Sequence, residues 1–84
     1  MNLTNTLTVS PNGFGFRSDT GEVFRLNSTA QAILGWLEEG ESEATISQRL
    51  AQQYDIPLTR VRTDVSTFLE HLENLNILHR HENH

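Results

Sequence analysis

The stretch from Gly21 to Gly40 constrains the fold most, because it joins a strand pattern to a helix pattern with almost no linker. Residues 22–26 alternate polar and apolar side chains, which is the period of a half-buried strand. From Ala30 to Leu37, apolar residues recur at i, i+3, i+4 and i+7, the spacing of one helix face. The strand must therefore lie at the mouth of the core that this helix builds.

The ends of this helix carry recognisable signals. Asn27 or Ser28 offers a side-chain oxygen to the free amides of a helix start. Gly40 can adopt the positive φ with which many helices end. The sequence predicts a helix over residues 28–39.

Two further strands are predicted before this stretch, at residues 6–10 and 14–17. Glycine-containing turns at residues 10–13 and 18–21 separate the three strands, which would form an antiparallel meander. One face of the meander is expected to turn four large apolar side chains toward the core: Phe14, Phe16, Phe24 and Leu26.

Two more helices are predicted after Gly40. The first spans residues 43–54, with Ser42 as its cap and an apolar stripe that ends at Tyr54. The second begins at Thr59, a candidate cap, and runs to about residue 74. Its apolar residues form a strong helical stripe: Val61, Val65, Phe68, Leu69, Leu72 and Leu75. Asn76 is expected to end this helix in a left-handed conformation.

Three strands followed by three helices predict an α+β fold with a winged helix-turn-helix-like arrangement. We expect a single domain over residues 1–78 and a flexible polar tail over residues 79–84.

Composition excludes several classes of protein. The chain has 84 residues, no cysteine, and eleven acidic against six basic residues, for a net charge of −5. Proteins that neutralise phosphates carry a basic excess, so no nucleic-acid partner is expected. The sequence has neither a signal peptide nor an apolar run of about 20 residues, so no membrane association is expected. The lack of cysteine fits a cytoplasmic protein.

No catalytic constellation is found, and we expect no enzymatic activity and no cofactor. Serines and threonines occupy predicted caps, turns and strand surfaces rather than a nucleophile elbow. Histidines at positions 71, 79, 81 and 84 have no carboxylate or thiolate at a ligand spacing, so no metal site is predicted.

We therefore expect a binding function, and the feature that indicates it is the strand at residues 22–26. It is the last strand of the predicted meander, so one of its edges has no neighbour. An open edge offers unpaired amides and carbonyls to an incoming strand. If the third helix lies beside this edge, the two form a groove in which an extended peptide could bind.

Three blocks of the sequence resemble the PqqD family, named from pyrroloquinoline quinone synthesis. They span Phe24–Leu34 with Gly40, Ile46–Ile56, and Asp64–Leu72. Their order and separation match the family over about residues 7–78. The chain departs from the family pattern after the third helix, where it has Asn76-Ile77 in place of Gly-Leu.

The resemblance implies a RiPP recognition element, a non-enzymatic peptide chaperone. Such a domain binds the leader of a ribosomally synthesised precursor peptide as an added strand. It then presents the leader to a modifying enzyme, often a radical-SAM protein. Carried over by position, the peptide-binding residues are Val23, Phe24, Arg25, Leu26, Arg60, Val61, Asp64, Val65, Phe68 and Leu69.

Two alternatives stay open at this point. The first is a DNA-binding winged-helix regulator whose third helix enters the major groove, although that helix carries Asp64, Glu70 and Glu73 beside its arginines. The second is a small adaptor or dimerisation module that pairs the same edge with its own copy. We expect a monomer or a weak dimer.

Overall fold

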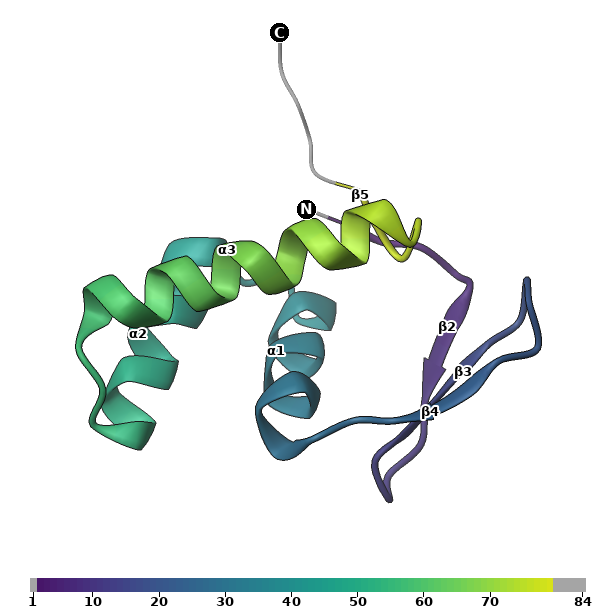
Figure 1. Ribbon diagram of the computed structural model, residues 1–84, viewed down its shortest axis with the longest axis horizontal. Helices are drawn as coiled ribbons and strands as arrows, with labels where there is room; N and C mark the ends of the chain where they lie inside the picture. The colour runs from purple at the N-terminus through teal and green to yellow at the C-terminus, as the bar shows by residue number, and fades with distance from the viewer. Residues whose placement is uncertain (1, 80–84) are drawn as a thin grey trace, which may run out of the picture.

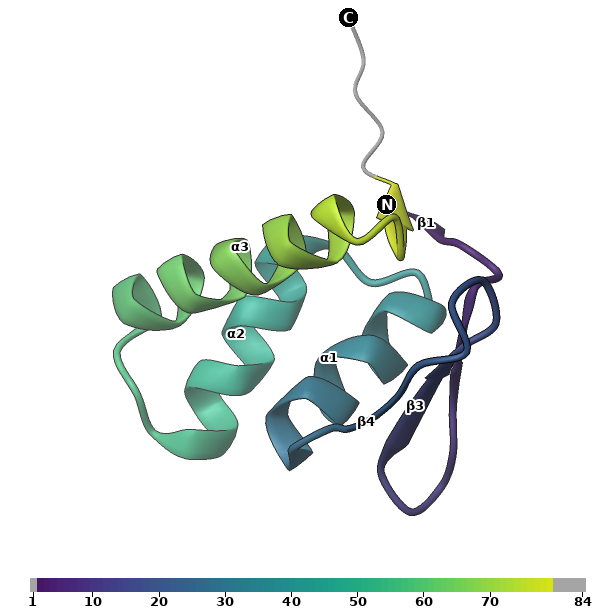
Figure 2. The ribbon, with the colours of Figure 1, turned by 45° about the vertical axis from the view of Figure 1, so that its right-hand side comes forward.

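The computed structural model describes residues 2–79 and has an α+β fold, as the sequence predicts (Figure 1). A three-stranded sheet stands at one end of a group of three helices, and α3 runs across α1 and α2 (Figures 1 and 2). The elements, in chain order, are β1 (Asn2–Leu3), β2 (Leu7–Val9), β3 (Phe14–Arg17), β4 (Val23–Arg25), α1 (Ser28–Glu38), α2 (Glu43–Tyr54), α3 (Leu58–Asn74) and β5 (Leu78–His79).

The sheet is an antiparallel meander in the order β2-β3-β4. Its register pairs Gly15 with Phe24, and the Phe24 ring occupies the space beside that glycine. A β-carbon on Gly15 would lie 2.8 Å from Cε2 of Phe24. The glycine is therefore required for the close approach of the two strands on the inner face of the sheet.

The expectation that Phe14 and Phe16 face the core is wrong. They are 39% and 44% exposed, whereas Gly15 and Arg17 of the same strand are buried. Side chains alternate along a strand, so the Phe24 ring beside Gly15 commits both β3 phenylalanines to the outer face. Phe24 and Leu26 lie on the inner side and are partly buried, as expected.

The caps of α1 and α2 are as predicted. Asn27 Oδ1 accepts a hydrogen bond from the Ala30 amide at 2.8 Å, and Ser42 Oγ accepts one from the Thr45 amide at 3.2 Å. α3 differs, because it begins at Leu58 after Pro57 and has no side-chain cap. Thr59 therefore lies inside the helix and is not the cap that the sequence suggested.

Both ends of α3 adjoin residues with positive φ. Asp55 ends α2 at φ 53°, ahead of α3, and Asn76 follows α3 at φ 61°. Asparagine tolerates this left-handed conformation, so Asn76 reverses the chain where the sequence predicted it.

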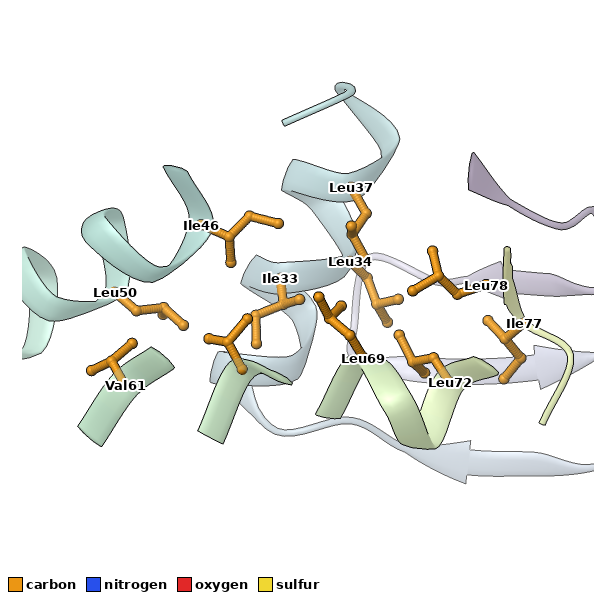
Figure 3. Close-up of a cluster of buried hydrophobic side chains, with 11 residues drawn as sticks. Ile33, Leu34, Leu37, Ile46, Leu50, Val61, Leu69, Leu72, Ile77 and Leu78 are labelled. Atoms are coloured by element: carbon orange, nitrogen blue, oxygen red, sulfur yellow. The ribbon is translucent and has the colours of Figure 1, made fainter. Parts of the chain in front are cut away.

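The core lies where the three helices meet the end of the sheet (Figure 3). It contains most of the predicted stripes of α1 and α3, the first part of the stripe of α2, and the segment that follows α3. Phe68 and Leu75, predicted in the α3 stripe, are only partly buried and pack against this core. The buried residues are Ile33, Leu34, Leu37, Ile46, Leu50, Val61, Val65, Leu69, Leu72, Ile77 and Leu78. Tyr54, predicted as the third stripe residue of α2, lies at the end of that helix and is exposed.

The two ends of the described chain pair with each other. β1 and β5 form a two-stranded ladder in which Leu3 lies opposite Leu78, and Thr4 N donates to Ile77 O at 2.8 Å. His79 belongs to β5, although the sequence placed it in the tail. The rest of the predicted tail, with His81 and His84, lies outside the described residues.

Candidate functional site

β4 is an edge strand, because the sheet order places β3 on one side of it and no strand on the other. Hydrogen bonds identify which of its backbone groups are free. Arg17 N donates to Glu22 O at 2.9 Å and Leu26 N donates to Gly13 O at 2.8 Å, so residues 22 and 26 direct their groups at β3. Bonding alternates along an antiparallel strand, so Phe24 also bonds to β3. Val23 and Arg25 therefore direct their amides and carbonyls at the open edge.

A groove of about 410 Å³ separates this edge from the C-terminal half of α3. We call it the strand–helix groove. Its lining is largely apolar and includes a few charged and polar residues. β4 and the residues beside it contribute Glu22, Phe24, Arg25, Leu26 and Asn27, and α3 contributes Phe68, His71 and Leu72, with Leu75 just beyond.

A second hollow of about 320 Å³, the three-helix pocket, continues from the groove. It lies between the start of α1, the end of α2 and the N-terminal half of α3, and its lining includes Tyr54, Val61 and Val65. Asn27, Ala30 and Phe68 line both hollows, so Phe68 stands at their junction. We call these two adjoining hollows together the depression.

Arg17 holds the two walls of the groove at a fixed separation. Its guanidinium donates to both carboxylate oxygens of Asp19, at 3.2 and 2.9 Å, and to Leu75 O at 2.9 Å. Glu22 lies 3.6 Å from the same guanidinium. Since Arg17 is on β3 and Leu75 follows α3, this side chain ties the sheet to the end of the helix.

The structure brings together most of the residues that the sequence proposed as a site. Phe24, Arg25 and Leu26 line the strand–helix groove, Val61, Asp64 and Val65 line the three-helix pocket, and Phe68 lines both. Val23 lies at the edge and is 64% exposed.

Two proposed residues lie away from the depression. Leu69 is 0% exposed and belongs to the core, so it has no surface to offer a ligand. Arg60 is exposed but lines neither hollow.

Several residues that line the depression were not expected from the sequence. Among them are Arg17, Ala30, Tyr54, Ile56, His71, Leu72 and Leu75. A signal for some of them was present, because Asp64, Phe68, His71 and Leu75 follow one another at helical spacing. Tyr54 and Ile56 come from a different helix and its following loop, and no local pattern connects them to α3.

The depression is lined by more apolar than charged side chains. Among residues 2–79, no group of three or more histidine, aspartate or glutamate side chains could hold a metal ion. No helix in the described part of the chain is long and apolar enough to cross a membrane. A larger hollow of about 630 Å³ lies between the N-terminal strands and the end of α1, and no residue of β4 or α3 lines it.

Two solved structures are similar to this chain. One is titled "TbiB1 in Complex with the TbiA(beta) Leader Peptide", with 22% identity and a TM-score of 0.85, covering 99% of this chain and 100% of that one. The other is titled "Lasso peptide synthetase B1 complexed with the leader peptide", with 25% identity and a TM-score of 0.79, covering 90% of this chain and 93% of that one. No curated protein matches the chain.

The open edge, all three helices and most of the groove lining lie within the part of the chain that matches a family. The model of the family described as coenzyme PQQ synthesis protein D (PqqD) matches residues 14–78, which is most of the chain. The protein therefore belongs to the PqqD family.

Proposed function

We propose that this protein binds the leader of a ribosomally synthesised precursor peptide and presents it to a modifying enzyme. The leader would add to the sheet as a fourth strand beside β4. The observation that carries the proposal is the open edge at Val23 and Arg25, which borders a largely apolar groove. Leader peptides in both similar structures support the same class of ligand here.

The edge and the groove would contribute to recognition in different ways. Backbone hydrogen bonds to Val23 and Arg25 would hold any extended segment, whatever its sequence. Alternate side chains of that segment would point into the strand–helix groove, where Phe68 and Leu72 offer apolar surface. Affinity would come from both sources, and preference for one sequence from the groove.

Under this proposal the protein is a chaperone without catalytic activity of its own, and the chemistry belongs to its partner enzyme. We place its action in the cytoplasm, where ribosomally made precursors are released. No observation favours the alternative of a DNA-binding regulator, and the exposed carboxylates of Asp64 and Glu70 on α3 would repel phosphate.

A proline substitution tests the edge directly. Peptides would first be selected from a random 12-residue display library against the wild-type protein, then labelled with fluorescein for anisotropy measurements. Val23→Pro removes an amide that faces the open edge and leaves the β3–β4 ladder intact. We expect it to weaken peptide binding by about tenfold, because it removes a backbone hydrogen bond and crowds the edge.

Val9→Pro is a matched control on the opposite edge of the sheet. Ser10 and Thr6 bond to β3, so the amide of Val9 also points away from the sheet. This variant should bind the same peptides within about twofold of wild type, since Val9 lines neither the strand–helix groove nor the three-helix pocket. Equal losses in the two variants, or amide shifts that cluster on α2 when peptide is added, would contradict strand addition at β4.

A further inference from the structure

Arg25 differs from Arg17 and Arg49, both of which the structure pairs with acids. Arg17 is held by Asp19 and Glu22, and Arg49 donates to Glu41 at 3.2 Å. Arg25 has no carboxylate partner within residues 2–79. Its guanidinium carbon instead lies 5.6 Å from the centre of the Phe14 ring, a cation–π distance. The ring holds the cation in place without neutralising it.

The position of Arg25 places this cation beside any strand that joins the sheet. Its backbone groups face the open edge, and its side chain lies on the outer face with Phe14, Phe16 and Val23. A residue paired directly with Arg25 would carry its side chain on the same face. In an antiparallel pair the β-carbons of such residues are about 5 Å apart. That side chain would lie within reach of the guanidinium.

The outer face offers Arg25 no competing charge. The described side chains around it are Thr8, Phe14, Phe16 and Val23, all of them uncharged. Asp19 and Glu22, near the far end of the hairpin, are engaged by Arg17. The protein as a whole carries a net charge of −5, so Arg25 is a local exception on an acidic molecule. Such a charge selects between partners more than it adds affinity.

The inner side of the same edge has the opposite character. Residues on either side of the one opposite Arg25 would point into the strand–helix groove, because side chains alternate in an extended chain. They would meet Phe24 and Leu26 from the sheet side, and Leu72 and Leu75 from the helix side. Apolar side chains fit these positions.

We infer that Arg25 is a specificity-determining residue, which reads an acidic side chain on the outward side of the bound leader. The leader class that fits the site has an aspartate or glutamate between two apolar residues. This inference rests on the proposed function, since it assumes that a strand adds to β4. It adds to that function that the peptide must carry a negative charge, and it specifies where in the peptide this charge lies.

Parallel selections test this inference. The random 12-residue display library would be selected against wild type and, separately, against Arg25→Glu. Wild type should enrich peptides with an acidic residue flanked by apolar ones. Arg25→Glu should enrich lysine or arginine at that position and keep the apolar flanks, since the apolar lining residues of the groove are unchanged.

A charge exchange gives the quantitative test. A peptide selected by wild type should bind Arg25→Glu about tenfold more weakly, as expected when a cross-strand ion pair becomes a like-charge pair. Replacing the acidic peptide residue by arginine should restore most of that loss. Arg62→Glu is the matched control, because Arg62 is exposed on α3 and lines neither hollow. It changes net charge equally and should alter affinity less than about twofold.

The outcomes separate the two proposals. If Arg25→Glu and Arg62→Glu weaken binding equally, or if both selections give the same charge pattern, Arg25 does not read the leader. Strand addition survives that result as long as the selected peptides lose affinity for Val23→Pro. If the selected peptides bind Val23→Pro and wild type equally, the proposed function fails with the inference. Circular dichroism of each variant would confirm that the fold is retained.

Discussion

Arg17 and Arg25 lie on adjacent strands, yet the two faces of the sheet use them in opposite ways. Arg17 is 9% exposed on the inner face, bonded to two acids and to the carbonyl of Leu75. Arg25 is exposed on the outer face and contacts the Phe14 ring. One arginine satisfies groups within the fold, and the other keeps its charge available. Arg17 on the inner face stabilises the domain, whereas Arg25 on the outer face stays exposed beside the β4 edge.

Arg17→Met should produce the largest effect that separates the faces. It removes the hydrogen bonds to Leu75 O and Asp19, and we expect the free energy of unfolding to fall by about 2 kcal/mol. We expect no larger loss of stability, because the carboxylates of Asp19 and Glu22 are partly exposed and are hydrated once the ion pairs are removed. Urea denaturation followed by circular dichroism measures it. Arg25→Met, its control on the outer face, should change stability by less than about 0.5 kcal/mol. Equal losses in the two variants would contradict the contrast.

Gly15→Ala should have a smaller effect on the inner face. The new methyl group would displace the Phe24 ring, at a cost of about 1–2 kcal/mol in the same denaturation experiment. Gly35→Ala is the control, since a β-carbon there meets nothing within 4 Å. Alanine in that helical position should stabilise the protein by about 0.5–1 kcal/mol. A stabilised Gly15→Ala variant would mean that Phe24 is not packed against β3.

Phe16→Ser should have the smallest effect, because it changes the outer face alone. Phe16 is exposed there, so thermal or urea unfolding should shift by no more than about 0.5 kcal/mol. The same change at Phe24, on the inner face, should cost more than about 1 kcal/mol because that ring is partly buried. A large loss at Phe16 would show that the outer face contributes to the folded core after all.

The parts of the fold that depend on local chemistry could be predicted from the sequence. Asn27 and Ser42 cap their helices because an amide three residues on lies within reach of their side-chain oxygens. The apolar stripe of α1 is buried as its spacing indicated. The open edge followed from the order of three short strands joined by tight turns.

The orientation of β3 could not be predicted in this way. A strand with the sequence Phe-Gly-Phe-Arg offers two faces, and hydrophobicity alone selects the phenylalanine face. The orientation of β3 is set by Phe24 on the next strand, because the Phe24 ring occupies the space beside Gly15. The predicted start of α3 was also wrong. The sequence suggested a cap at Thr59, but the helix begins directly after Pro57.

The candidate site was predictable to the extent that it lies on one strand and one helix. Asp64 and Phe68, expected from the family resemblance, line the three-helix pocket, whereas Tyr54 and Ile56 reach the same hollow from another segment. Leu69 was placed in the site by the family resemblance, and spacing along the helix could not show that this position faces the core. The β1–β5 pairing joins the two ends of the described chain, and two-residue strands carry no local signal.

The contact between Gly15 and Phe24 also fixes the pairing register of β3 and β4. If β4 slipped by one residue along β3, Phe24 would lie opposite Phe14 or Phe16 and lose the space that it fills. The contact therefore fixes which residues of β4 present their amides and carbonyls outward. A bound peptide would always be aligned against Val23 and Arg25, with Phe24 between them, so its outward and inward positions would be assigned by a glycine that it never touches.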